Sequence, residues 1–305
     1  MTSKSPPIPI SDLRPSIGAI WLQAIRPKTL SAALAPVGVG TGLAIADDVV
    51  RWAPVVAALL GAILIQIGTN LANDFFDFKK GADTEARLGP ARVTQKGWVS
   101  PKEVAIATIS IFVLAVIVGS YLVYIGGFPI VGIGIASILS GVLYTGGPRP
   151  LGYMGLGDVF VFIFFGPVAL CGTYYVQALD VSILSFWASI PVGLLATVIL
   201  VVNNLRDRDT DVLANKRTLA VRFGASAARA EYLILVVAAY GALFVPPVFY
   251  KVSFGWLLPL ISLPLAVREV WAIYSKDGID LNPHLGAAAR LGLVFALLLA
   301  LGVNG

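Results

Sequence analysis

The stretch that decides the fold is ILSFWASIPVGLLATVILVVNNLRDRDTD, residues 183–211. Its first part, 183–204, contains no charged residue and is about as long as a helix must be to cross ~30 Å of hydrocarbon. The seven residues that follow, 205–211, carry five charges. An apolar run that ends abruptly in charges predicts a transmembrane helix whose end reaches the membrane surface.

The rest of the chain repeats this pattern. Of its 305 residues, 57% are hydrophobic and 13% are charged, against roughly 25% charged in an ordinary soluble domain. Apolar segments of spanning length occur at 28–46, 53–73, 103–125, 128–146, 157–178, 183–204, 230–250, 254–274 and 286–303. Membrane β-barrels have segments of ~10 alternating residues instead. The sequence therefore excludes a water-soluble fold and predicts an all-α, polytopic membrane protein with about nine transmembrane helices.

Lysine and arginine are distributed unevenly among the predicted connections. If the N-terminus lies in the cytoplasm, only Arg51 and Lys251 of the 22 basic residues fall on the opposite side. Basic residues concentrate on the cytoplasmic side of membrane proteins, so we expect an N-in, C-out topology in the cytoplasmic membrane of the cell. The net charge of +5 then reflects topology, and no nucleic-acid partner is expected.

The chain divides into a polar, proline-rich N-terminal segment, residues 1–27, and one membrane domain, residues 28–305. The N-terminal segment has no basic region leading into a short apolar core with a small-residue cleavage site. We therefore do not expect it to be a cleavable signal peptide.

Two helix ends repeat one design, in which an amide is followed by two carboxylates on a single helix face. The two sets are Asn70, Asp74 and Asp77, spaced i, i+4, i+7, and Asn203, Asp207 and Asp211, spaced i, i+4, i+8. Carboxylates on one face repel each other, and near a membrane each must be hydrated or paired. Solvated helix ends with basic neighbours would explain one such set, but the repetition favours a bound cation.

The side-chain chemistry indicates which cation. Cys171 and His284 are the only cysteine and histidine, which excludes Cys- or His-rich metal sites. Oxygen ligands suit Mg²⁺, which binds through one or two carboxylates together with the phosphates of a substrate. A diphosphate could approach such an acidic face only with divalent ions and basic side chains to neutralise it. The basic candidates are Lys28, Arg149, Lys216 and Arg217.

These motifs, in their order along the chain, resemble those of the UbiA superfamily of intramembrane aromatic prenyltransferases. The acidic motifs read Asn73-Asp74-x-x-Asp77, with Asp83 downstream, and Asn203-Asn204-x-x-Asp207-x-x-x-Asp211. Four more stretches are similar to the branch that makes menaquinone: RPKTL at 26–30, GPARVTQKG at 89–97, YTGG at 144–147 and KRTLAVRFG at 216–224. The resemblance covers nearly the whole chain. It departs from the family pattern at Asp83, which lies six residues past Asp77 rather than the usual four.

The resemblance implies helices around a central chamber and a defined reaction. A polyprenyl group would pass from polyprenyl diphosphate to 1,4-dihydroxy-2-naphthoate with loss of diphosphate and CO₂, giving demethylmenaquinone. Mg²⁺ would be held by Asp74, Asp77, Asp207, Asp211 and, as a further candidate, Asp83. The neutral groups beside the metal and diphosphate would be Asn70, Asn73, Asn203 and Asn204. Tyr144 would lie where the acceptor enters, and the acceptor carboxylate would bind Arg149 or, as second candidate, Lys28.

Two alternatives remain open from the sequence. A sister prenyltransferase would use another aromatic acceptor, such as 4-hydroxybenzoate, homogentisate or a chlorophyllide. A secondary transporter would also pair acidic residues between helices, but transporter sites usually lie near the bilayer midplane. Both acidic motifs here lie at the cytoplasmic ends of predicted helices, which favours the enzyme.

The predicted topology can be tested by cysteine labelling. In a Cys171→Ser background, we expect cysteines placed in the two acidic regions to react with an impermeant reagent only from the cytoplasmic side. A cysteine at the position of Gly305 should react only from the outside. A C-terminus that is labelled from the cytoplasm would reduce the number of spans by one.

Overall fold

The computed structural model describes residues 15–82 and 87–304, and within these ranges every regular element is a helix. The elements are α1 (Ile17–Ile25), α2 (Pro27–Ala46), α3 (Trp52–Lys79), α4 (Pro101–Gly126), α5 (Phe128–Leu143), η2 (Gly152–Met154), α6 (Gly157–Ile163), η3 (Phe164–Val168), α7 (Ala169–Ala178), α8 (Ile183–Leu213), α9 (Leu219–Ala242), α10 (Val245–Phe249), η4 (Phe254–Ser262), α11 (Leu263–Ser275), η5 (Gly278–Leu281) and α12 (Asn282–Gly302).

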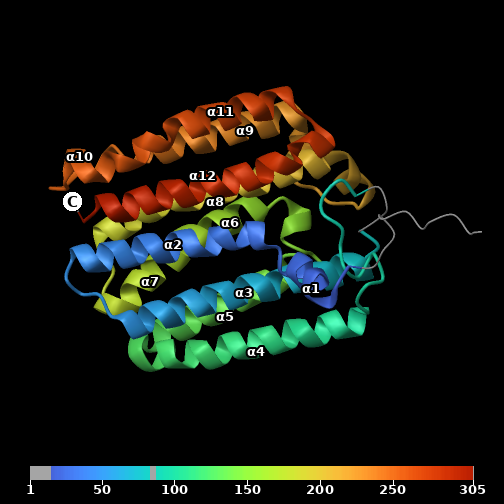
Figure 1. The fold of residues 1–305 in the computed structure, drawn as a ribbon, viewed down its shortest axis with the longest axis horizontal. Helices are drawn as coiled ribbons and strands as arrows, with labels where there is room; N and C mark the ends of the chain where they lie inside the picture. The colour runs from blue at the N-terminus through green and yellow to red at the C-terminus, as the bar shows by residue number, and fades with distance from the viewer. Residues whose placement is uncertain (1–14, 83–86, 305) are drawn as a thin grey trace, which may run out of the picture.

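The long helices lie side by side in one bundle (Figure 1). α3 packs against α4 and α5 in one half, and α8 packs against α9 and α12 in the other. α2 joins the halves, because it contacts α3 and α7 on one side and α12 and α8 on the other. The largest buried apolar cluster, which includes Val39, Leu195, Tyr232 and Phe295, lies among α2, α8, α9 and α12.

The predicted all-α membrane fold is confirmed. Within the described ranges, eight helical segments are long and apolar enough to span a membrane. The segment predicted at 128–146 is the exception, because its helix, α5, covers only Phe128–Leu143. At 1.5 Å per residue its 16 residues extend about 24 Å, less than the ~30 Å of a typical hydrocarbon core.

The charge-rich residues 205–229 are largely helical. α8 continues to Leu213, and α9 begins at Leu219 with the Thr218 hydroxyl accepting a hydrogen bond from the backbone N–H of Val221. The backbone N–H of Lys216 donates to the carbonyl of Asp211 at 2.9 Å. These charges therefore lie on the two helices and on the tight connection between them.

A short helix, α1, forms within the predicted N-terminal segment 1–27. The Ser16 hydroxyl caps its first turn, and the helix ends at Arg26, whose φ of 57° is left-handed and lets the chain turn directly into α2. Ile20 and Ala24 are buried in a small cluster with Leu71 and Val93. α1 thus lies on the polar end of α3.

The two ends of the bundle differ. α1 and the connections after α3 lie at one end of Figure 1, whereas α10 and the C-terminus lie at the other. The start of α2, next to α1, and the C-terminal end of α12 therefore lie at opposite ends of the bundle.

η3 and α8 cross at two glycines. η3 is a five-residue π-helix that contains Pro167, and proline removes the N–H that a regular helix would use at that point. A Cβ on Gly193 would lie 2.7 Å from the carbonyl oxygen of Phe162, and one on Gly166 would lie 2.9 Å from the Cα of Gly193. The two backbones can approach this closely only without side chains.

We expect Gly193→Ala to destabilise the bundle by about 1–3 kcal/mol, the usual cost of overpacking. Gly38→Ala on α2 is the matched control, because a Cβ there has no neighbour within 4 Å and alanine is the better helix former. The measurement is the free energy of unfolding in detergent. Equal stability of the two variants would contradict the close crossing.

Candidate active site

The two acidic motifs meet at one end of the bundle. Asp74 and Asp77 on α3, and Asp207 and Asp211 on α8, are all buried. The Nζ atom of Lys216 lies 3.6 Å from Asp77 Oδ2 and 3.6 Å from Asp211 Oδ1. One ammonium group therefore bridges carboxylates from two helices that are far apart in the sequence.

A chain segment folds over the first motif. This covering segment, residues 87–98, contains Arg92, whose Nη2 atom donates to Asp77 Oδ2 at 2.9 Å. The backbone N–H groups of Val93 and Thr94 donate to the carboxylate of Asp74 at 3.2 and 3.4 Å, and the Thr94 hydroxyl donates to it as well. These contacts give the stretch GPARVTQKG, singled out from the sequence, a definite structural role.

The second motif is paired within its own helix. Arg206 donates to both oxygens of Asp207, from Nε at 2.8 Å and from Nη2 at 2.6 Å. Asp209 instead points outward, where its side chain is 80% exposed and pairs with Arg208. The face of α8 that carries Asp207 and Asp211 is therefore the inward one, as the spacing predicts.

Tyr153 is a central residue of the site that the sequence motifs did not select for this role. Its hydroxyl donates to Asp77 Oδ1 at 2.8 Å. The Nζ atoms of Lys80 and Lys216 lie 5.0 and 5.1 Å from the centre of its ring, within the range of cation–π attraction. The ring therefore holds two ammonium groups next to the acidic cluster.

Lys80 links the acidic cluster to the YTGG stretch, residues 144–147. Its ammonium group donates to the carbonyl oxygens of Thr145 at 2.6 Å and Gly147 at 3.1 Å. Burial lowers the pKa of Lys80, the charge of Asp77 opposes this shift, and the nearby Lys216 ammonium adds to it. The YTGG stretch thus reaches the acidic cluster through backbone carbonyls.

The candidate amides have separate roles. Asn70 donates to the carbonyl of Ile25 at 2.8 Å and to the hydroxyl of Thr29 at 3.0 Å, so it fastens the turn between α1 and α2. The Asn73 side chain accepts a hydrogen bond from the Thr145 hydroxyl at 2.8 Å. The two amides of α8 differ as well: Asn204 is buried, and Asn203 accepts from Arg206 at 2.7 Å.

The basic candidates are not equivalent. Lys216 lies inside the cluster, whereas Lys28, Arg149 and Arg217 are exposed. In the part of the chain that the structure describes, none of these three forms an ion pair with a motif aspartate. Asp83, a further ligand candidate, lies outside the described residues.

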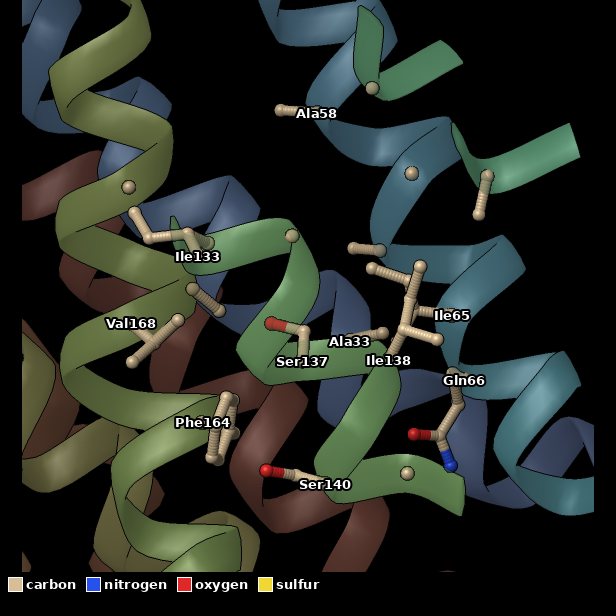
Figure 2. Close-up of a pocket in the computed structure, with 18 of the residues that line it drawn as sticks. Ala33, Ala58, Ile65, Gln66, Ile133, Ser137, Ile138, Ser140, Phe164 and Val168 are labelled. Carbon is tan, nitrogen blue, oxygen red and sulfur yellow. The ribbon is translucent and has the colours of Figure 1, made fainter. Parts of the chain in front are cut away.

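An apolar cavity of about 540 Å³ begins beside the motifs. Its polar end is lined by Asn70, Asn73 and Tyr144. Ala58 also lines it, and the distance from Ala58 to Asn73 along α3 is about 22 Å at 1.5 Å per residue. Figure 2 shows other lining residues, which include Ile65 and Gln66 on α3, Ile133, Ser137, Ile138 and Ser140 on α5, and Phe164 and Val168 on η3.

The donor set at the polar end suits a hard divalent cation. Among the described residues, no three side chains of Asp, Glu, His or Cys lie close enough together to hold one metal ion by themselves. However, the position between Asp77 and Asp211 already attracts a positive charge, that of Lys216. Mg²⁺ prefers carboxylate and amide oxygens as ligands, so the residues fit this ion.

Comparison with known proteins gives consistent results. The model of the UbiA prenyltransferase family matches residues 33–284. The 1,4-dihydroxy-2-naphthoate octaprenyltransferase of Escherichia coli is 38% identical over 295 residues, which are 93% of this chain and 94% of that protein. The enzymes of the same name from Haemophilus influenzae and Mycobacterium tuberculosis are 36% and 37% identical, and the matches span 95% and 96% of their lengths.

Solved structures show the same fold at low sequence identity. A UbiA homolog from Archaeoglobus fulgidus bound to DMAPP and Mg²⁺ aligns with a TM-score of 0.69 at 17% identity, covering 92% of this chain and 97% of that one. The apo structure of a UbiA homolog from Aeropyrum pernix K1 aligns with a TM-score of 0.67 at 14% identity, with the same coverage.

Proposed function

The chain belongs to the UbiA prenyltransferase family, and we propose that it transfers a polyprenyl group from polyprenyl diphosphate to 1,4-dihydroxy-2-naphthoate. Diphosphate and CO₂ leave, and the product is demethylmenaquinol, the reduced form of demethylmenaquinone, an intermediate of menaquinone biosynthesis. One observation carries the proposal: carboxylates of two helices share the Lys216 ammonium group beside the polar end of a long apolar cavity. An amphiphilic donor, with a charged diphosphate and an apolar tail, fits this arrangement.

The diphosphate would bind at the acidic end. Asp74, Asp77, Asp207 and Asp211 are proposed to hold Mg²⁺, with Asn73 and Asn204 as neutral neighbours, and the ion would neutralise the charge of the departing diphosphate. The ammonium group of Lys216 already forms ion pairs with Asp77 and Asp211 at this position. Lys28, Arg149 and Arg217 are exposed near the same end and are proposed to meet the anionic substrates as they bind.

The cavity would protect the prenyl group while its bond to diphosphate breaks. The carbon left behind is an allylic cation, which water would quench. Phe160 and Phe164 line the cavity, and their rings stack with centroids 6.0 Å apart. Aromatic faces attract cations, and a wall without charged side chains excludes water.

The acceptor would approach from the polar end, near Tyr144. An electron pair of the naphthoate ring then attacks the allylic cation and forms the new carbon–carbon bond, after the departing diphosphate has taken the electron pair of the broken carbon–oxygen bond. Loss of CO₂ from the same ring carbon returns an electron pair to the ring and restores aromaticity, so no strong base is required. Arg149 is the first candidate for the acceptor carboxylate and Lys28 the second, because a guanidinium suits two-point contact with a carboxylate.

The protein is a multi-pass membrane protein. We place it in the cytoplasmic membrane with the N-terminus and the acidic end on the cytoplasmic side, because nearly all of its basic residues would then be cytoplasmic. The secondary-transporter alternative is dropped, because the chain belongs to a family of transferases.

The acceptor and the metal can be tested together. Purified protein with labelled polyprenyl diphosphate should prenylate 1,4-dihydroxy-2-naphthoate in preference to 4-hydroxybenzoate, homogentisate or a chlorophyllide. Mass spectrometry should show a product without the carboxyl group, and excess EDTA should stop turnover until Mg²⁺ is restored. A retained carboxylate or a preference for 4-hydroxybenzoate would assign the protein to a sister branch, and turnover in EDTA would exclude the metal.

The four inward carboxylates should matter more than their exposed neighbour. Replacing Asp74, Asp77, Asp207 or Asp211 by alanine should each lower the prenyl-transfer rate at least ~10²-fold, as expected for loss of one oriented group that stabilises the leaving charge. Asp209→Ala is the control, because that side chain is exposed. If Asp209→Ala is as damaging as Asp207→Ala while Asp211→Ala is neutral, the assignment of the inward face is wrong.

A further inference from the structure

Arg206 is a buried charged residue next to the site with several hydrogen bonds, and the proposed reaction gives it no role. Its side chain is only 1% exposed. Besides the two hydrogen bonds to Asp207, its Nη2 atom donates to Asn203 and its Nη1 atom donates to Asn282 Oδ1 at 3.1 Å. A guanidinium fork that binds both oxygens of a carboxylate fixes that carboxylate in one plane.

Asn282 carries this network to another part of the chain. It is the first residue of α12, and its Nδ2 atom donates to the backbone carbonyl of Leu88 at 2.9 Å. Asn282 therefore accepts from Arg206 through its oxygen and donates to Leu88 through its nitrogen. The amide of Asn282 thus supplies both the acceptor for Arg206 and the donor for Leu88.

The covering segment is shaped to meet Arg206. A Cβ on Gly89 would lie 2.6 Å from Arg206 Nη2, so the backbone at residue 89 lies directly against the guanidinium group. The neighbouring Leu88 side chain packs near Gly278, where an added Cβ would lie 3.6 Å from Leu88 Cδ1. The beginning of the covering segment thus rests on α8 and η5.

The other part of the covering segment binds the first motif. Arg92 pairs with Asp77, and the N–H groups of Val93 and Thr94 bind Asp74. One short segment is therefore held by both motifs, at Leu88 through Asn282 and Arg206, and at residues 92–94 directly. Loss of the first attachment would leave residues 92–94 to hold the segment against Asp74 and Asp77.

We propose that Arg206 and Asn282 are positioning residues that fix the carboxylate of Asp207 and fasten the covering segment across both motifs. They act through Asp207 and the covering segment, and they do not touch the reacting atoms. The proposal rests on the proposed function only for the identity of the ligand, a diphosphate with a divalent cation. Its structural part can be measured without any turnover.

Asn282→Asp separates the two halves of this network. An aspartate retains an oxygen that can accept from Arg206, but it lacks the N–H that donates to Leu88. Asn304→Asp is the matched control, because Asn304 also donates to a backbone carbonyl, that of Gly42 at 3.0 Å, and it lies at the opposite end of the bundle. Both variants make the same amide-to-carboxylate change: Asn282 loses its donation to Leu88, and Asn304 loses its donations to Gly42 and, at 2.8 Å, to Ala300.

The first measurement is amide hydrogen exchange of the whole protein in detergent. Asn282→Asp should speed exchange in residues 87–98 roughly 5- to 10-fold, the effect of losing about one hydrogen bond, while α8 remains protected. Asn304→Asp should leave residues 87–98 unchanged. Unchanged exchange in residues 87–98 of Asn282→Asp, or equal acceleration throughout α8 and α12, would overturn the proposal.

The second measurement is the affinity for inorganic diphosphate in the presence of Mg²⁺. Asn282→Asp and Gly89→Ala should both weaken it several-fold and should raise the KM for the prenyl diphosphate more than they lower kcat. Gly38→Ala and Asn304→Asp should not. Wild-type affinity in both site variants would overturn the proposal, whereas a wild-type protein that binds Mg²⁺-diphosphate but prenylates no acceptor would overturn only the proposed function.

Discussion

Four buried carboxylates at the ends of two membrane helices are the constraint on which the rest of the structure depends. An ionised carboxylate removed from water is costly unless it is paired and hydrogen-bonded. Each of these four has a partner in the chain: N–H groups for Asp74, Arg92 for Asp77, Arg206 for Asp207 and Lys216 for Asp211. These partners offset part of the cost of burying the four carboxylates before any substrate binds.

The partners determine how the connections at this end are folded. Arg92 binds Asp77 and so fixes the covering segment over α3. Lys216 belongs to the link between α8 and α9, and its ion pairs with Asp77 and Asp211 keep that link close to both motifs. Tyr153 brings the connection before α6 onto the same cluster through its hydroxyl and its ring. The polar end is therefore assembled around the acids, and residues from distant parts of the chain meet there because each satisfies a charge.

The features of the fold and site that could be predicted are those that depend on residues close together in the sequence. The apolar segments follow from composition, and the inward faces of α3 and α8 follow from helical spacing, which the burial of Asp74, Asp77, Asp207 and Asp211 confirms. The roles of Arg206 and Tyr153 could not be found in this way, because they depend on partners from other parts of the chain. The spacing of Asp207 and Asp211 predicts a helix there, but the end of that helix at Leu213 could not be located, because dense charge marks the end of the apolar run and not the end of the helix.

The boundary between the acidic end and the cavity explains why the site lies at a helix end and not at the bilayer midplane. The residues on this boundary, Asn70, Asn73 and Tyr144, are polar but neutral. A charged side chain here would draw in water or a counter-ion, whereas an amide or a phenol can hydrogen-bond without doing so. The bond that breaks in a prenyl diphosphate joins a strongly hydrated anion to an apolar chain, so its two sides need opposite surroundings within one bond length. Only a position where a buried polar cluster meets a dry cavity provides both, and in a membrane protein that position lies where the helices leave the hydrocarbon.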